Sequence, residues 1–116
     1  MGSNRMKLGT FGEDLAVAEL ESQGLEIIER NWRCRAGEID IVAKDDGVIA
    51  ICEVKTRRGL GYGTPLEAIT ADKHARLRRL AVLWAKERRC WLPLRIDIIG
   101  VLLPGPIITH ARGVDL

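Results

Sequence analysis

Apolar and polar residues alternate in the middle of the chain, in two segments separated by a short polar turn. Residues 37–42 read Gly-Glu-Ile-Asp-Ile-Val, and residues 48–55 read Val-Ile-Ala-Ile-Cys-Glu-Val-Lys. Both segments are rich in β-branched residues, and Asp45-Asp46-Gly47 between them consists of turn formers. The pattern predicts a β-hairpin.

Three charged side chains lie inside this hairpin. Because side chains alternate faces along a strand, Glu53 and Lys55 project together, whereas Cys52 and Val54 project the other way. A suitable register places Asp40 beside Glu53. Two carboxylates about 4 Å apart repel by roughly 4 kcal/mol at an effective dielectric of about 20, so a proton, Lys55 or a divalent cation has to compensate the charge. The alternative is that all three face solvent on the open side of the hairpin.

A helix is predicted over residues 10–23, which are followed by a glycine. One apolar stripe of this helix begins at Phe11, while Glu13 shares a second apolar side with Val17 and Leu20. That spacing allows Glu13 to point inward. The alternative is a first-turn glutamate that the helix dipole stabilises.

Residues 25–30 alternate loosely and predict a first strand, connected to the hairpin by residues 31–37. Trp32 in this connection has arginine neighbours, among them Arg33, and such a group can stack on a base or clamp a phosphate. The alternative is a core tryptophan whose neighbouring arginines extend to solvent.

Residues 56–63 combine three glycines with Arg57 and Arg58, which predicts a mobile basic loop able to contact a phosphate backbone. A capping box then begins at Thr64, with Pro65 at the first helical position. This pair predicts the start of the second helix.

The second helix has an apolar stripe with steps of three and four residues: Leu66, Ile69, Lys73, Leu77, Leu80 and Trp84. Lys73 lies within the stripe, so its ammonium either reaches a negative partner, such as the Asp40 and Glu53 patch, or extends past its neighbours to solvent. Thr70 is an alternative N-cap, for a helix that starts at Ala71.

The other faces of this helix are basic and carry Arg76, Arg78, Arg79, Lys86, Arg88 and Arg89. A solvated surface explains such a face, and so does contact with nucleic acid. Further on, residues 94–103 form a long apolar run typical of a strand buried on both faces in the middle of a sheet. Asp97 interrupts this run and needs a partner such as Arg95. Residues 107–110 predict a short antiparallel edge strand.

Length and composition limit the interpretation. The chain has 116 residues, of which 47% are hydrophobic, so we expect a flexible N-terminal tail over residues 1–6 and a single domain over residues 7–116. The formal net charge is +2, and affinity for nucleic acid must therefore come from local clusters. Three cysteines without a Cys-x-x-Cys pair favour a reducing, cytoplasmic location over a zinc site or disulfides. No apolar segment is long enough to span a membrane.

The order helix, three strands, helix, strand predicts an α/β fold with an αβββαβ core, in which helices flank a mixed sheet. Several motifs at matching spacing resemble the YraN-like family: Gly12-Glu13, Arg30-Asn31 with Arg33, Gly37-Glu38-Ile39-Asp40, Glu53-Val54-Lys55 followed by Arg57, Pro65 with Glu67-Ala68, Lys73, and Arg95-x-Asp97. The resemblance implies a restriction-endonuclease-like, Holliday-junction-resolvase-like fold and a catalytic core of the PD-(D/E)xK nuclease superfamily. Ile39 stands where that superfamily usually has a proline before the aspartate.

By this resemblance, Asp40 and Glu53 would hold one or two Mg²⁺ or Mn²⁺ ions. The carbonyl of Val54 and the carboxylate of Glu13 would add ligands, and Lys55 would position or activate the attacking water. The implied function is metal-dependent hydrolysis of DNA phosphodiester bonds, including structure-specific cutting in repair or recombination.

Contacts with nucleic acid are expected from five cations: Arg33, Arg57, Arg58, Lys73 and Arg76. A homodimer would suit a cut in both strands. Two other interpretations stay open: a nucleic-acid-binding module that keeps the fold without turnover, and a protein-interaction domain whose carboxylates only decorate the surface.

Overall fold

The computed structural model of the chain describes residues 3–59 and 69–115. Its elements, in chain order, are α1 (Ser3–Ser22), β1 (Glu26–Cys34), β2 (Gly37–Asp45), β3 (Val48–Arg58), α2 (Ala71–Arg88), β4 (Leu94–Leu103) and β5 (Ile107–Ala111). This order confirms the α/β class and the αβββαβ core with a mixed sheet flanked by helices, and β5 adds an edge strand. In this described part of the chain, no helix is both long and apolar enough to cross a membrane.

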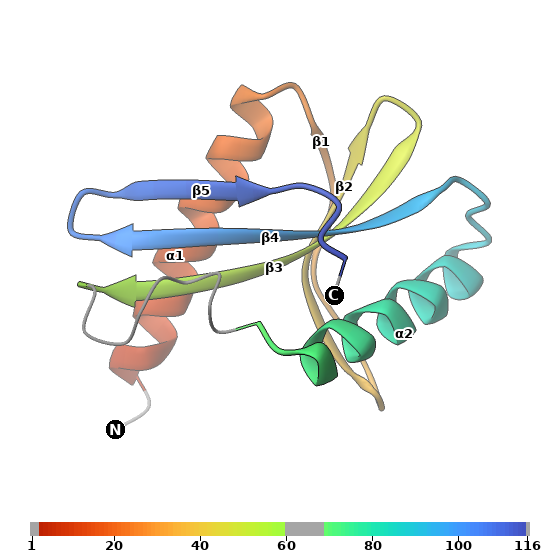
Figure 1. Cartoon of the computed structure of the whole chain (residues 1–116), viewed down its shortest axis with the longest axis horizontal. Coiled ribbons are helices and arrows are strands. Elements are labelled where there is room, and N and C mark those ends of the chain that lie inside the picture. The colour runs from red at the N-terminus through yellow and green to blue at the C-terminus, as the bar shows by residue number, and fades with distance from the viewer. Residues whose placement is uncertain (1–2, 60–68, 116) are drawn as a thin grey trace.

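The five strands form one sheet in the order β1-β2-β3-β4-β5 (Figure 1). Neighbouring strands are antiparallel except β3 and β4, which are parallel. A parallel pair needs a crossover connection, and α2 lies in that connection. The apolar run over residues 94–103 becomes β4, between β3 and β5, as its burial on both faces predicted.

The two helices cover opposite faces of the sheet. Ile49 and Ile51 of β3 pack on the α2 side, whereas Ala50 and Cys52 pack on the α1 side. In Figure 1, α1 lies behind the strands and α2 lies in front of them. The result is three layers with a separate apolar cluster on each face.

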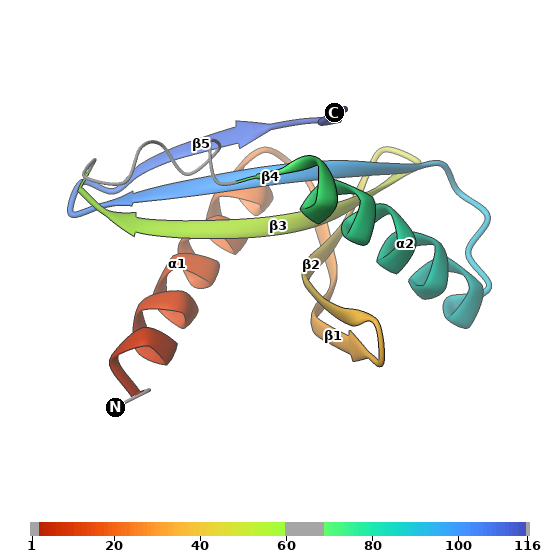
Figure 2. The ribbon, with the colours of Figure 1, turned by 60° about the horizontal axis from the view of Figure 1, so that its bottom comes forward.

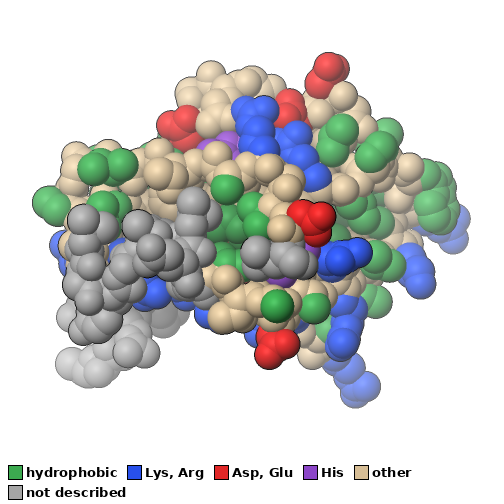
Figure 3. Space-filling view, viewed as in Figure 1, with side chains coloured by type: hydrophobic (Ala, Val, Ile, Leu, Met, Phe, Trp, Pro, Cys, Tyr) green, Lys and Arg blue, Asp and Glu red, His purple; other side chains and the backbone are tan. Residues whose placement is uncertain are grey.

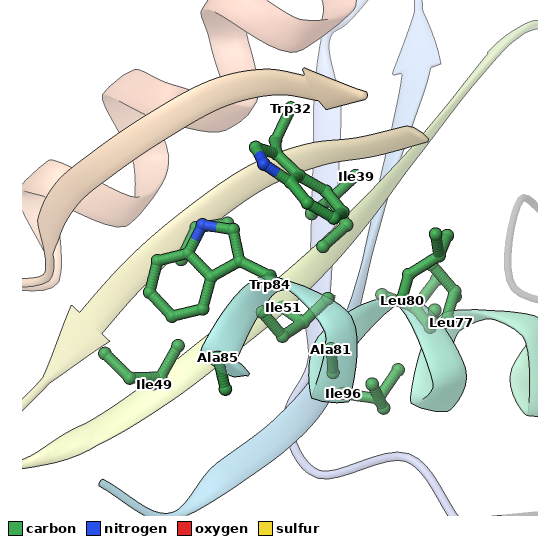
Figure 4. Packing of buried hydrophobic residues seen from close by; sticks show 12 residues of the cluster. Trp32, Ile39, Ile49, Ile51, Leu77, Leu80, Ala81, Trp84, Ala85 and Ile96 are labelled. Atoms are coloured by element: carbon green, nitrogen blue, oxygen red, sulfur yellow. The ribbon is translucent and has the colours of Figure 1, made fainter. Parts of the chain in front are cut away.

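Two tryptophans occupy the cluster under α2 (Figure 4). The indole N–H of Trp84 donates to Glu29 at 3.1 Å, and that of Trp32 donates to Glu87 at 2.6 Å. Only 7% of Trp32 is exposed. The hypothesis that Trp32 stacks on a base is therefore wrong, and its alternative as a core residue is confirmed.

Helix α1 begins at Ser3 rather than Thr10. Its buried side runs through Glu13, Ala16 and Leu20, while Phe11 is 52% exposed. The stripe predicted from Phe11 is wrong at Phe11 and Ala18, which are exposed, whereas Leu15 packs at the border of the apolar cluster under the helix. Ala16 and Leu20 keep the spacing of three and four residues that burial along a helix requires.

Helix α2 begins at Ala71, because Thr70 accepts a hydrogen bond from the backbone N–H of Lys73 at 3.2 Å. The alternative N-cap is thus confirmed, and the start proposed at Thr64 lies outside the described residues. His74 takes the buried position of the first turn, and Lys73 is only half-buried.

The basic loop predicted over residues 56–63 is wrong at its beginning. Residues 56–58 continue β3 as far as Arg58, in parallel register with β4. Residues 60–63 lie outside the described part of the chain. The first strand is also longer than predicted, because β1 continues to Cys34.

Candidate active site

The ladder between β2 and β3 ends at the pair of Ile41 and Cys52. One residue further, Asp40 Oδ2 accepts the backbone N–H of Val54 at 2.8 Å. At this point the carboxylate of Asp40, rather than a backbone carbonyl of β2, accepts the hydrogen bond from β3. Figure 2 shows the β1–β2 hairpin curving away from the rest of the sheet. The Asp40 carboxylate thus satisfies the backbone N–H of Val54 at the point where β2 and β3 separate.

The structure brings Asp40 and Glu53 together, as the hairpin register predicted. Burial, with the hydrogen bond and the negative charge of Glu53, raises the pKa of Asp40 to about 8, against the opposing effect of the Val54 N–H. Two carboxyl groups form a hydrogen bond only if one of them carries a proton. With its pKa at about 8, Asp40 holds its proton at neutral pH and donates it to Glu53.

A cavity of about 480 Å³ opens at this fork between the strands. Asp40 of β2, Val54, Lys55 and Arg57 of β3, and Glu13 of α1 all line it. Cys52 and Val54 pack on the α1 face, as strand alternation predicted. Elements α1, β2 and β3 therefore supply acidic and basic groups to one cavity.

Glu13 is held in the cavity wall by two residues of β1. Its Oε1 accepts from Arg30 Nε and from Asn31 Nδ2, both at 3.0 Å, and Glu13 is only 9% exposed. Asn31 has a φ of 56° in the middle of the strand, a left-handed conformation that non-glycine residues rarely adopt. Glu13 points inward, and it is not a first-turn residue because α1 begins at Ser3.

Gly12 allows α1 to reach β3 beside the cavity. A Cβ at this position would lie 1.9 Å from Thr56 Oγ1. The contact sets the depth at which Glu13 enters the site. The sequence predicted no role for Gly12 or Asn31 and placed Arg30 only among the arginines that flank Trp32, although all three belong to the motifs that carry the family resemblance.

Two cations of β3 differ from the other basic residues near the site. The Lys55 ammonium has no ion pair within residues 3–59 and 69–115, and Arg57 Nε is buried without a hydrogen-bond acceptor. An unsatisfied buried donor costs about 1–3 kcal/mol. Arg33, in contrast, pairs with Glu38 at the cavity wall.

The remaining basic candidates lie outside the cavity. Arg58 is exposed at the end of β3, and Arg76 is exposed on α2. Lys73 is half-buried in the first turn of α2 and is not among the described residues that line the cavity. The structure thus brings Asp40, Lys55, Glu13 and Arg57 together at the cavity and leaves Arg58, Lys73 and Arg76 apart from them. Glu53 lies beside Asp40 but is not among the residues that line the cavity.

The oxygen donors suit a hard divalent cation such as Mg²⁺ or Mn²⁺. Asp40 and Glu53 need a proton to lie together, and a cation between them would replace it. No cluster of three or more metal-binding side chains occurs in the part of the chain that the structure describes. An ion held here by one or two carboxylates would complete its shell with water and substrate oxygens, as Mg²⁺ usually does.

A second buried carboxylate, Asp97, has a different environment. It is fully buried and accepts hydrogen bonds from Arg95 Nε at 2.9 Å, His110 Nε2 at 2.8 Å and the Gly113 N–H at 3.0 Å. Burial raises the pKa of Asp97, but these hydrogen bonds outweigh it and hold the pKa below its ordinary value. The expected partnership with Arg95 is confirmed. Both carboxylate oxygens of Asp97 accept hydrogen bonds within the protein, so Asp97 has a structural role.

Comparison with known proteins agrees with the motifs. Residues 12–101 match the model of "Uncharacterised protein family UPF0102". A UPF0102 protein of Nocardia farcinica is 50% identical over 96% of this chain and 91% of its own length, and one of Streptomyces coelicolor is 51% identical over 95% and 89%. One of Pseudarthrobacter chlorophenolicus is 52% identical over 92% and 84%. The chain therefore belongs to the UPF0102 family, which is the YraN family that its motifs resemble.

Proposed function

We propose that this protein is a metal-dependent nuclease that hydrolyses DNA phosphodiester bonds, with a preference for branched or nicked structures. The observation that carries the proposal is the Asp40 carboxyl group, which lies beside Glu53 with its pKa raised to about 8 and lines one cavity with Lys55. An acidic pair with an adjacent ammonium can bind a divalent ion and orient a nucleophile beside it.

The residues would divide the work as follows. Asp40, Glu53 and the Val54 carbonyl would hold Mg²⁺ or Mn²⁺, and Glu13 would contribute its free oxygen, since Oε1 is held by Arg30 and Asn31. The bound ion would lower the pKa of a water molecule and offset negative charge on the phosphate. Lys55 would orient the attacking water by a hydrogen bond from its ammonium.

Nucleic acid would contact basic residues around and beyond the cavity. Arg33, Arg57 and Arg58 lie on the strands that form it, and Lys73 and Arg76 lie on α2. Figure 3 shows Lys and Arg side chains gathered over α2. Such a surface binds the phosphate backbone without reading sequence. Two copies of the chain would serve a cut in both strands, and the three free cysteines suit the cytoplasm.

The test is cleavage of branched, nicked and single-stranded DNA with Mg²⁺ or Mn²⁺. We expect Asp40→Asn, Glu53→Gln and Lys55→Ala to lower the rate by at least about a hundredfold. Asp46→Asn, which changes an exposed turn carboxylate, should cut at the wild-type rate. A folded wild-type protein that cuts none of these DNAs with either metal would refute the proposal.

The second candidate is a nucleic-acid-binding module without turnover. It is favoured by the Lys and Arg side chains gathered over α2, which can bind a phosphate backbone without any catalytic step. Calorimetric titration with Mn²⁺ separates the two candidates. A nuclease should bind Mn²⁺ and lose that binding in Glu53→Gln, whereas a module should bind DNA equally well with or without Glu53.

A further inference from the structure

Arg57 is a half-buried arginine of the sheet that lacks an acid. Arg30, Arg33 and Arg95 of the sheet each form an ion pair with a carboxylate, and Arg58, which forms none among the described residues, is exposed. Arg57 has no ion pair within the described residues, and its Nε is the buried side-chain atom there that lacks a hydrogen-bond partner. A buried guanidinium N–H without an acceptor in the protein can donate a hydrogen bond to a bound ligand.

The backbone fixes where this donor lies. Arg57 is paired with Leu102 in the parallel ladder between β3 and β4, so its position does not depend on a loop. It follows Lys55 by two residues, which puts both side chains on one face of β3 about 6–7 Å apart along the strand. Both line the cavity that contains Asp40.

The charges around the cavity select the ligand. Its wall includes the acids Asp40 and Glu13 and also Lys55 and Arg57, which form no ion pair among the described residues. A ligand that satisfies both kinds of group carries an anion that binds a guanidinium fork and also shares a divalent cation with carboxylates. Phosphate oxygens do both, and a guanidinium binds them through two parallel N–H groups.

We propose that Arg57 forms the phosphate subsite of this cavity, with its Nε–H and one terminal N–H donating to two non-bridging oxygens of a phosphodiester. This inference rests on the proposed function for its substrate class. Binding through Arg57 needs no metal and no bond cleavage, because the donors are already in place. Arg57 therefore orients the phosphate, and Lys55 acts on the nucleophile beside it.

Binding of a fluorescein-labelled single-stranded DNA, followed by anisotropy in EDTA, tests the subsite without turnover. Arg57→Gln should weaken binding by about tenfold, which is typical of a lost charge-assisted hydrogen bond. Arg57→Lys keeps the charge but loses the fork, so it should recover only part of the affinity. Lys44→Gln removes one charge at the far end of β2 and should change affinity by less than about twofold.

Inorganic pyrophosphate isolates the phosphate from the base and sugar. It should raise the melting temperature of the wild type in EDTA and leave that of Arg57→Gln unchanged. Arg57→Met, which removes the unsatisfied donor, should melt at or above the wild-type temperature, so that lost binding cannot come from unfolding.

Three results would overturn the subsite: no DNA or pyrophosphate binding by the wild type, unchanged binding by Arg57→Gln, or an equal loss in Lys44→Gln. The nuclease proposal fails separately. DNA binding that depends on Arg57, without cleavage in Mn²⁺, would refute the nuclease and support the subsite. Cleavage by Arg57→Gln with an unchanged KM would support the nuclease and refute the subsite.

Discussion

At the scale of single residues, Asp40 has two roles that pull in opposite directions. Its carboxylate accepts the N–H of Val54 where β2 separates from β3, which stabilises the fork between the strands. Burial and the neighbouring Glu53 carboxylate also raise its pKa to about 8, so that ionising Asp40 costs stability. Strongly shifted pKa values of this kind cluster at functional sites.

Replacing Asp40 with asparagine should therefore stabilise the protein above neutral pH. The folded pKa of Asp40 is higher than that of an unfolded aspartate, so the free energy of unfolding falls as pH rises from about 4 to about 8. Asparagine stays neutral, accepts from Val54 and donates to Glu53. Urea unfolding at several pH values should give Asp40→Asn an advantage on the order of 2 kcal/mol at about pH 8, and little advantage at about pH 5.

The control for this experiment is Asp46→Asn, in an exposed turn at a left-handed position that asparagine also accepts. Its unfolding curve should follow the wild type at every pH. Parallel pH profiles for Asp40→Asn and the wild type would contradict the raised pKa of Asp40.

Asn31 offers a second residue-scale prediction. Asn31→Gly keeps the left-handed backbone but removes the amide that holds Glu13, so we expect a stability change below about 1 kcal/mol. Calorimetry should nevertheless show Mn²⁺ affinity reduced by about tenfold or more, the usual effect of removing a group that orients a ligand. An unchanged Mn²⁺ affinity would remove Glu13 and its clamp from the metal site.

At the scale of elements, the sequence predicted what short-range patterns encode. The observed bounds of β4 match the predicted ones because a long apolar run lies between Pro93 and Pro104. Asp40 was predicted beside Glu53 from the alternation of side chains in the hairpin, and the structure places it there. The clamp on Glu13 was missed because it joins α1 to β1 through an unusual φ at Asn31. Periodicity carries no information about a contact of that kind.

The contact between α1 and β3 gives the element-scale prediction. Gly12→Ala would place a methyl group 1.9 Å from Thr56 Oγ1, so the helix must move away from the strand. We expect a loss of about 1–3 kcal/mol in the free energy of unfolding, measured with urea. Thr56→Ala in the same chain should restore part of it, because it removes the nearest atom.

Gly9 is the matched control, since a Cβ there meets nothing within 4 Å. Gly9→Ala in the same helix should be neutral or stabilising by up to about 1 kcal/mol. Equal losses in the two variants would mean that helix propensity, rather than the approach of α1 to β3, governs both.

At the scale of the whole molecule, the C-terminal residues complete the fold beyond the region that matches the family model. That match ends at residue 101, yet Asp97 within it takes partners from His110 and Gly113. The Val114 N–H donates to the Ile96 carbonyl at 2.8 Å, and the Val114 carbonyl lies 2.6 Å from His74 Nε2 on α2. The end of the chain therefore ties β4 and β5 to α2.

Asp97→Asn should consequently have the opposite pH signature to Asp40→Asn. The folded pKa of Asp97 lies below that of an unfolded aspartate, so its contribution is present above about pH 4 and is lost as pH falls through the folded value. The variant should lose about 2–4 kcal/mol at neutral pH, because Arg95 is left without its buried partner, and should converge on the wild type in acid. Urea unfolding of both variants across one pH series decides the assignment. Two buried aspartates on neighbouring parts of one sheet should give slopes of opposite sign, and the same sign for both would contradict the division into an anchor and a functional site.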